Sequence, residues 1–180
     1  MTHLDLSDNR IGPQGVKALS NSFCQNVRFQ ELNLANNVLG AQGASALSKA
    51  VSCSGSKLTH VNISGNRLVE NGDQGEADTS GLAVLCNGSG TDNAKHAEGL
   101  VSPNCAVTHL HLGSNNLGSA GADVVGRMLR SNAIMTQLNL SGPDQNLGAM
   151  GVRLLAVHVS AFVTYAYFIP FLSLPSLSCL

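Results

Sequence analysis

The chain repeats one order of apolar and polar positions along most of its length. In the first copy the apolar residues Leu4 and Leu6 are followed by Asn9, Gly12 and Gly15. Alternate residues of a strand point to opposite faces, so Leu4 and Leu6 are expected to enter a core while their neighbours point outward. Each copy therefore predicts one short strand. The leading apolar residues of the copies are Leu4, Leu32, Val61, Leu110 and Leu138, mostly about 28 residues apart.

A helix is predicted after the second glycine of each copy. Gly15 is followed by Val16, Leu19 and Phe23, and these steps of three and four place the apolar side chains in one stripe. Similar stripes follow Gly43, Gly121 and Gly151. Strand and helix in every copy predict an α/β solenoid, a horseshoe with a parallel β-sheet on its concave face and helices on its convex face.

The full order, L-x-x-L-x-L-x-x-N-x-L-G-x-x-G, resembles the ribonuclease-inhibitor-like class of leucine-rich repeats. That class includes ribonuclease inhibitor, the sensor regions of NOD-like receptors and the Ran GTPase-activating protein. The match extends over residues 1–159, as about five repeats. Members of the class share a scaffold and little chemistry, so the resemblance implies the fold more firmly than the function.

An asparagine follows each strand in most copies. The chain must turn there inside a stack, where backbone groups cannot reach water, and an amide side chain can both accept and donate hydrogen bonds. We therefore expect a buried ladder of side chains at these turns. Two extra residues and Pro143 disturb the position in the fifth copy. The expected ladder consists of Asn9, Asn37, Asn66 and Asn115.

The third repeat is enlarged by insertions around residues 70–106. Val61 and Leu110 are 49 residues apart, where one period is about 28. Gly81 and Leu85 are expected to take the helix-opening roles of Gly15 and Leu19. The stretch 87–93 is then a surface loop, which we interpret as a tolerated insertion in preference to a binding loop.

Both ends of the chain depart from the repeat. Met1 occupies an apolar position with no capping element before it, so the chain is expected to be a piece of a longer protein or to have that face covered. Residues 160–180 form a hydrophobic tail of uncertain status. It fits three readings: a membrane tail anchor, a closing strand with Tyr165 and Phe168 in the places of Met135 and Leu138, or a mistaken or truncated reading frame.

Composition narrows the class of protein. Charged residues make up 12% of the chain and the net charge is −1, so no basic field exists to attract nucleic acid. No secretory signal is visible, which predicts a cytoplasmic protein, with a membrane tail-anchored protein as the alternative. The sequons at Asn62, Asn87 and Asn139 are then accidental. Free thiols in a reducing compartment are predicted for the widely spaced cysteines Cys24, Cys53, Cys86, Cys105 and Cys179.

The outward-facing strand residues are the candidate binding site. Neighbouring strands lie about 4.8 Å apart, so these residues should stand in two polar columns on the concave face. We expect them to bind another protein, of unknown identity, through hydrogen bonds and a few charges. They are His3, Asp5, Glu31, Asn33, His60, Asn62, His109, His111, Gln137 and Asn139.

Histidines in these columns suggest sharper hypotheses. His60, His109 and His111 could together hold zinc, although we interpret them as ordinary polar residues of an exposed strand and predict no metal site. A related hypothesis is partner binding that weakens below about pH 6.5, as neighbouring imidazoles gain charge and repel.

No catalytic motif or cofactor-binding sequence is present, so no catalytic residue, no cofactor and no enzyme activity are expected. Two alternatives to a simple scaffold follow from the resemblance alone: a GTPase-activating protein of the Ran type, and a regulatory or sensor fragment of a NOD-like multidomain protein.

Overall fold

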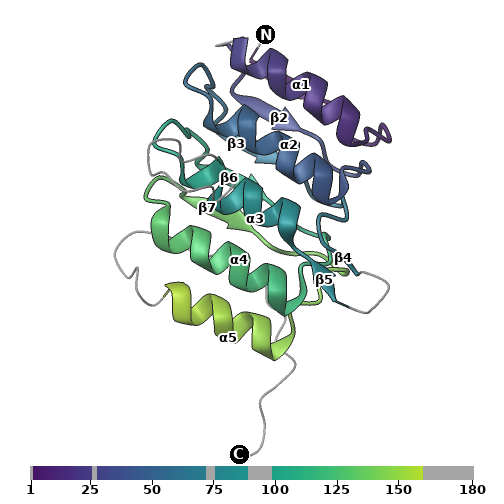
Figure 1. Ribbon diagram of the computed structural model, residues 1–180, viewed down its shortest axis with the longest axis vertical. Coiled ribbons are helices and arrows are strands. Elements are labelled where there is room, and N and C mark those ends of the chain that lie inside the picture. Colours follow the sequence, from purple (N-terminus) through teal and green to yellow (C-terminus); the bar gives the residue numbers. More distant parts are fainter. Residues whose placement is uncertain (1, 26–27, 72–75, 89–98, 160–180) are drawn as a thin grey trace, which may run out of the picture.

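The computed structural model describes residues 2–25, 28–71, 76–88 and 99–159. Met1 and the hydrophobic tail at 160–180, with its three readings, lie outside the described residues. Within the described part, a sheet forms one layer and helices cover one of its faces (Figure 1).

The sheet is fully parallel and its strands follow one another in the order of the chain, β1-β2-β3-β6-β7. Its register aligns the leading apolar residue of every repeat, so that Leu32 pairs with Leu4 on one side and with Val61 on the other. The α/β solenoid predicted from the sequence is confirmed. The strands are β1 (His3–Asp5), β2 (Glu31–Asn33), β3 (His60–Asn62), β6 (His109–His111) and β7 (Gln137–Asn139). The helices are α1 (Pro13–Gln25), α2 (Gly40–Ser52), α3 (Ser80–Asn87), α4 (Gly118–Ser131) and α5 (Gly148–Val159).

The core lies between the sheet and the helices. Leu32, Val61 and Leu110 on the three central strands are at most 2% exposed, because a repeat packs on each side of them. Leu4 and Leu138, on the two outer strands, are only partly buried. Burial of the apolar strand residues therefore depends on neighbouring repeats, as expected for a solenoid.

Helices begin earlier than the sequence predicted. We expected the second glycine of each repeat to open the helix, whereas α2 begins at the first, Gly40, which has a φ of +59°. The second glycine, Gly43, lies in the first turn, where an added Cβ would come within 2.8 Å of Cβ of Leu39. Gly43 thus permits close packing against Leu39 inside the helix rather than marking its start.

The enlarged third repeat keeps its place in the sheet. Its extra residues include a small antiparallel pair, β4 (Glu70–Asn71) with β5 (Ala77–Asp78), and a 3₁₀ turn, η1 (Gly99–Val101). Gly81 and Leu85 are buried in α3, and β3 still pairs directly with β6. Most of the stretch 87–93, for which we predicted a surface loop, lies outside the described residues.

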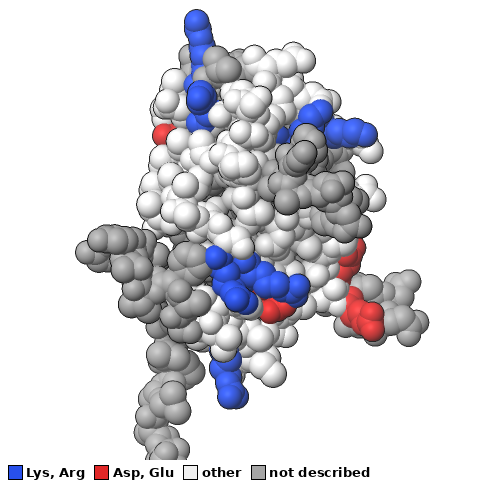
Figure 2. Space-filling view, turned by 60° about the vertical axis from the view of Figure 1, so that its left-hand side comes forward, with Lys and Arg blue, Asp and Glu red and all other residues white. Residues whose placement is uncertain are grey.

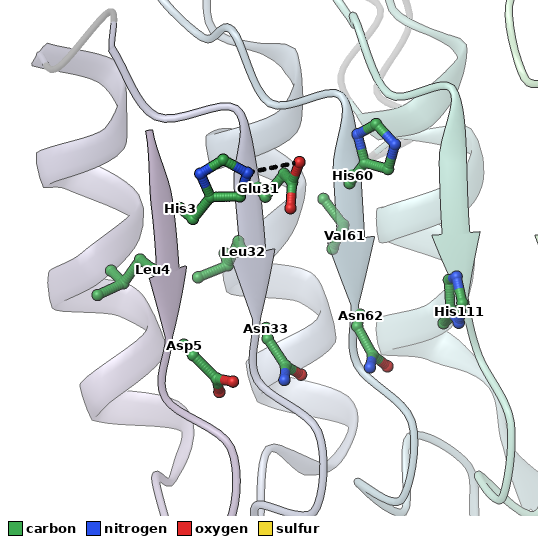
Figure 3. A pocket seen from close by; sticks show the side chains of 10 residues that line it. All are labelled: His3, Leu4, Asp5, Glu31, Leu32, Asn33, His60, Val61, Asn62 and His111. Atoms are coloured by element: carbon green, nitrogen blue, oxygen red, sulfur yellow. Dashed lines mark ion pairs between the residues drawn. The ribbon is translucent and has the colours of Figure 1, made fainter. Parts of the chain in front are cut away.

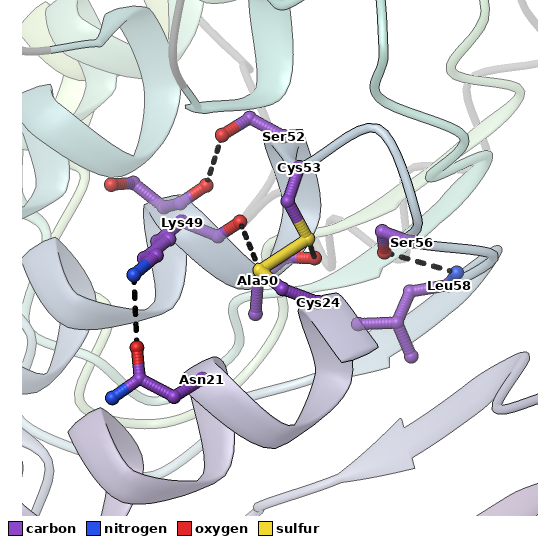
Figure 4. Close-up of a disulfide and its surroundings, with 9 residues drawn as sticks. Asn21, Cys24, Lys49, Ala50, Ser52, Cys53, Ser56 and Leu58 are labelled. Carbon is purple, nitrogen blue, oxygen red and sulfur yellow. Dashed lines mark hydrogen bonds between the residues drawn. A yellow bond between two sulfur atoms is a disulfide. The ribbon is translucent and has the colours of Figure 1, made fainter. Parts of the chain in front are cut away.

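Cys24 and Cys53 form a disulfide, so the prediction of free thiols was wrong for this pair (Figure 4). Cys24 lies in the last turn of α1 and Cys53 directly follows α2, so they occupy matching places in consecutive repeats. Their Cα atoms are 5.6 Å apart, a separation that a disulfide spans without distortion. Cys86 and Cys105 are free and buried, and Cys179 lies outside the described residues.

The surface carries few charges. On the side of the molecule seen in Figure 2, Lys and Arg side chains occur in separate groups with uncharged surface between them. Among the described residues, no helix is both long enough and apolar enough to cross a bilayer.

Candidate partner-binding face

The turns after the strands are fastened by buried amide side chains. Asn37, Asn66 and Asn115 are at most 5% exposed. Nδ2 of Asn66 donates to the backbone carbonyl of Leu34 in the preceding repeat at 2.8 Å, and also to carbonyls of its own turn. Asn37 and Asn115 repeat this arrangement with Leu6 and Ile63. The outward-facing sheet residues are therefore followed by turns that are hydrogen-bonded from one repeat to the next.

Asn9, the first expected member of this ladder, differs from the others. It is exposed, and its Nδ2 donates to the carbonyl of Ser7, two residues earlier, because no described strand precedes β1. The ladder instead continues in the fifth repeat through Gln145, which is 3% exposed. Its Oε1 accepts from the backbone N–H of Asn115 at 2.8 Å and its Nε2 donates to the carbonyl of Leu112 at 2.9 Å. In the repeat with the two extra residues, the longer amide side chain of Gln145 thus makes the hydrogen bonds that asparagine makes in the other repeats.

All ten candidate residues lie on the five strands of this sheet, and the register arranges them in two columns. The first column is His3, Glu31, His60, His109 and Gln137. The second column is Asp5, Asn33, Asn62, His111 and Asn139. A hollow of about 410 Å³ opens between them, with seven of the ten in its lining (Figure 3). No lysine or arginine is among its lining residues.

The amino-terminal end of this face carries its two carboxylates. Nε2 of His3 lies 2.8 Å from Oε1 of Glu31, with both side chains largely exposed. Asp5 accepts a 2.9 Å hydrogen bond from the backbone N–H of Ser7. That bond, with further bonds from the side chains of Ser7 and Asn33, lowers the pKa of Asp5. This end of the face therefore stays negative at neutral pH.

His60 and His109 stack on each other in the middle of the first column. Their ring centroids are 4.0 Å apart and the planes differ by 17°. The pKa of His109 is lowered, first by burial and then by the nearby His60 and His111. The pKa of His111 is lowered by burial and by His60. The imidazoles of His109 and His111 are consequently held toward their neutral forms.

The zinc hypothesis finds no geometric support in this arrangement. Within the described ranges, no three His, Cys, Asp or Glu side chains gather closely enough to hold a metal ion. Stacked rings such as those of His60 and His109 direct their lone pairs side by side, whereas chelation requires lone pairs that converge on one point.

Comparison with known proteins agrees with the architecture. A family model described as leucine-rich repeat matches residues 1–20, 25–48 and 104–126. The human NACHT, LRR and PYD domains-containing protein 14 is 31% identical over 157 residues, which is 87% of this chain and 12% of that protein. The chain is a leucine-rich repeat protein. It spans only that small fraction of its human relative's length.

Solved structures show the same fold at low sequence identity. Actin-binding site 2 of leiomodin-1 superposes with a TM-score of 0.59 at 14% identity, over 89% of this leucine-rich repeat protein and 82% of that chain. The tropomodulin C-terminal domain of Caenorhabditis elegans superposes with a TM-score of 0.58 at 12% identity, over 89% and 83% of the two chains.

Two residues that contact the stacked histidines, Thr59 and Thr108, were not among the predicted site residues. Each directly precedes a stacked histidine, and its hydroxyl lies within 2.9 Å of Nδ1 of that histidine. The same hydroxyls donate to carbonyls of the preceding strand at 3.2 Å. The recurring Thr-His dipeptide at 2–3, 59–60 and 108–109 is the signal by which they could have been found.

Proposed function

We propose that this leucine-rich repeat protein binds another protein across the two polar columns of its sheet and performs no chemistry itself. One observation carries the proposal: polar side chains as far apart in sequence as Asp5 and His111, 106 residues, stand in register around one hollow. A row of polar groups on a rigid sheet suits the recognition of a partner's surface, where hydrogen bonds and charges give specificity.

The fold supports this proposal in two further ways. Leucine-rich repeats commonly serve as protein-interaction scaffolds, because a solenoid presents an extended surface in place of a deep pocket. The amide ladder beneath the columns keeps them from rearranging, which reduces the entropy lost when a partner binds.

Site-specific photo-crosslinking tests the proposal. A photoreactive benzoylphenylalanine replaces Asn62 in the second column or, as a matched control, Ala120 on the exposed surface of α4. We expect position 62 to yield a discrete cross-linked product after irradiation in cells, and position 120 to yield none. Products at position 120 but not at position 62 would move the binding site to the helices.

A second candidate function is supported by the human relative. The similarity to a NACHT, LRR and PYD domains-containing protein favours a regulatory or sensor role within a larger multidomain protein. Sequencing the full-length transcript tests this candidate. A nucleotide-binding region encoded upstream in the same reading frame would support it, and an upstream stop codon in that frame would exclude it.

The Ran-type alternative has no counterpart among the residues of the sheet face. We infer a binding role and not GTPase activation, and a GTP hydrolysis assay with and without the chain checks this inference. Acceleration of hydrolysis by a GTPase in the presence of the chain would contradict it.

A further inference from the structure

The hydrogen atoms of the stacked histidines can be assigned from their neighbours. Thr59 Oγ1 donates to the carbonyl of Gln30, and Thr108 Oγ1 donates to the carbonyl of Thr59. A hydroxyl carries a single hydrogen, so a hydroxyl that donates to the carbonyl accepts from the imidazole Nδ1 beside it, 2.9 Å away in His60 and 2.8 Å away in His109. We assign this tautomer, with the proton on Nδ1, to both rings. In the neutral ring, Nε2 is then a bare acceptor.

The stack places these two acceptors side by side. The rings of His60 and His109 are nearly parallel and each contacts the preceding threonine through Nδ1, so we infer that their Nε2 atoms lie on the same side of the stack. Glu31 pairs with His60 in the sheet register and adds a carboxylate to the same column; its Oε1 contacts Nε2 of His3, which leaves the second oxygen as the acceptor. The middle of the first column is thus a row of acceptors on three successive strands.

The second column has the opposite character. Oδ1 of Asn62 accepts from the backbone N–H of Ser64 at 3.1 Å, and Oδ1 of Asn139 accepts from that of Ser141 at 2.8 Å. Because the turn occupies each amide oxygen, the NH₂ group is left to face a ligand. The amide of Asn62 therefore presents a donor beside the acceptor row, on the same strand as His60.

We propose that Glu31, His60 and His109 form a site for the guanidinium group of an arginine in the partner protein, while the amide of Asn62 donates to a main-chain carbonyl of the same segment. This inference rests on the proposed function and specifies the chemistry of the partner.

Arginine fits this row better than lysine does. The acceptors lie on strands about 4.8 Å apart, so the ligand's donors must be spread out. A guanidinium carries its N–H donors around a rigid plane and accepts no hydrogen bond, whereas the donors of an ammonium all share one nitrogen. The carboxylate of Glu31 and the absence of lysine and arginine from the lining of the hollow favour a cation.

Peptide binding tests the proposal on the intact chain. The probes are two short fluorescein-labelled peptides, glycine alternating with arginine in one and with lysine in the other, measured by fluorescence anisotropy near pH 7.5. We expect the arginine peptide to bind about 10-fold more tightly. His60→Phe and His109→Phe keep a stacked ring but remove the acceptor, and each should weaken arginine-peptide binding about 5-fold while changing lysine-peptide binding less than about 2-fold.

Ala120→Phe is the matched control, since it adds the same aromatic ring on the exposed surface of α4, away from both columns. It should leave both affinities within about 2-fold of wild type. Circular dichroism establishes that each variant is folded. Equal affinity for the two peptides, no binding of the arginine peptide, or unchanged binding in His60→Phe would overturn the proposal. A partner cross-linked at position 62 through a segment without arginine would also overturn it, while leaving the proposed function standing.

Discussion

The backbone N–H of Asn66 donates a 2.7 Å hydrogen bond to Oδ1 of Asn115, 49 residues later in the chain. The same Asn115 donates through Nδ2 to the carbonyl of Ile63, in the strand segment that leads to Asn66. Asn115 therefore hydrogen-bonds two backbone groups of the repeat before it, and the enlarged third repeat does not interrupt the ladder.

Replacement of a buried ladder amide should lower the free energy of unfolding. Asn66→Ala removes the hydrogen bonds that the buried amide makes to three carbonyls and takes the acceptor from the backbone N–H of Leu39, so we expect the free energy of unfolding to fall by about 3 kcal/mol. Asn9→Ala is the matched control, because Asn9 is exposed, and it should lose less than about 1 kcal/mol. Urea unfolding followed by circular dichroism measures both. Similar losses in the two variants would mean that burial of the amide is not what stabilises the turn.

Close contact between α2 and α3 depends on Gly81. A Cβ added there would press against the backbone carbonyl of Ala41, which cannot rotate away as a side chain could. Gly81→Ala should therefore destabilise the fold by about 2–3 kcal/mol. Gly12→Ala, where nothing lies within 4 Å of the added Cβ, should stay within about 1 kcal/mol of wild type. Urea midpoints compare the two, and an equally stable Gly81→Ala variant would refute the packing argument.

Reduction should weaken the first two repeats. The disulfide between Cys24 and Cys53 closes a sequence separation of 29 residues. Loop-closure entropy predicts a stabilisation of about 3–4 kcal/mol from such a cross-link. We expect dithiothreitol to lower the urea midpoint of the wild-type chain and to leave Cys24→Ser unaffected. If wild type and Cys24→Ser respond alike, the cross-link contributes no stability.

The histidine columns should respond to acid. The folded state lowers the pKa of His109 and His111 from 6.5, so it binds fewer protons than the unfolded chain as the pH falls below about 6.5. The stability from these groups is complete above that pH and is lost as the pH falls through the lower, folded-state values. The other titratable groups on this face are His3, Asp5, Glu31 and His60.

Proton NMR titration of the imidazoles measures this effect directly. The resonances of His109 and His111 should titrate below pH 6.5. His60→Phe removes a neighbouring positive charge, so both midpoints should rise, whereas Gln137→Ala should leave them in place. Unchanged midpoints in His60→Phe would show that the imidazoles do not interact electrostatically.

Repeat periodicity made the architecture predictable. The apolar pair Leu32 and Leu34 has a counterpart in every copy, such as Val61 and Ile63 in the third, because each repeat must bury side chains at these two positions. The outward columns follow from the same alternation. The early start of α2 was not predicted, because a glycine at positive φ and a glycine in close contact look identical in sequence.

The repeat pattern did not predict which side chains contact each other. The stack of His60 on His109 depends on side-chain conformations that the two threonines hold, and no period encodes them. The Cys24–Cys53 pair depends on how closely the ends of α1 and α2 approach, although their separation by one period was a usable clue. Gln145 was missed because we expected an asparagine, and a longer amide performs the same task.

The uninterrupted pairing of β3 with β6 has a consequence for how this surface can change. Additional chain is accommodated beyond the sheet, at the β4–β5 pair and η1, so His60 still stands beside His109. Length can therefore vary in this repeat without altering the spacing of the groups displayed on the sheet. Insertions into such a repeat and substitutions of its outward-facing strand residues can therefore arise independently of each other.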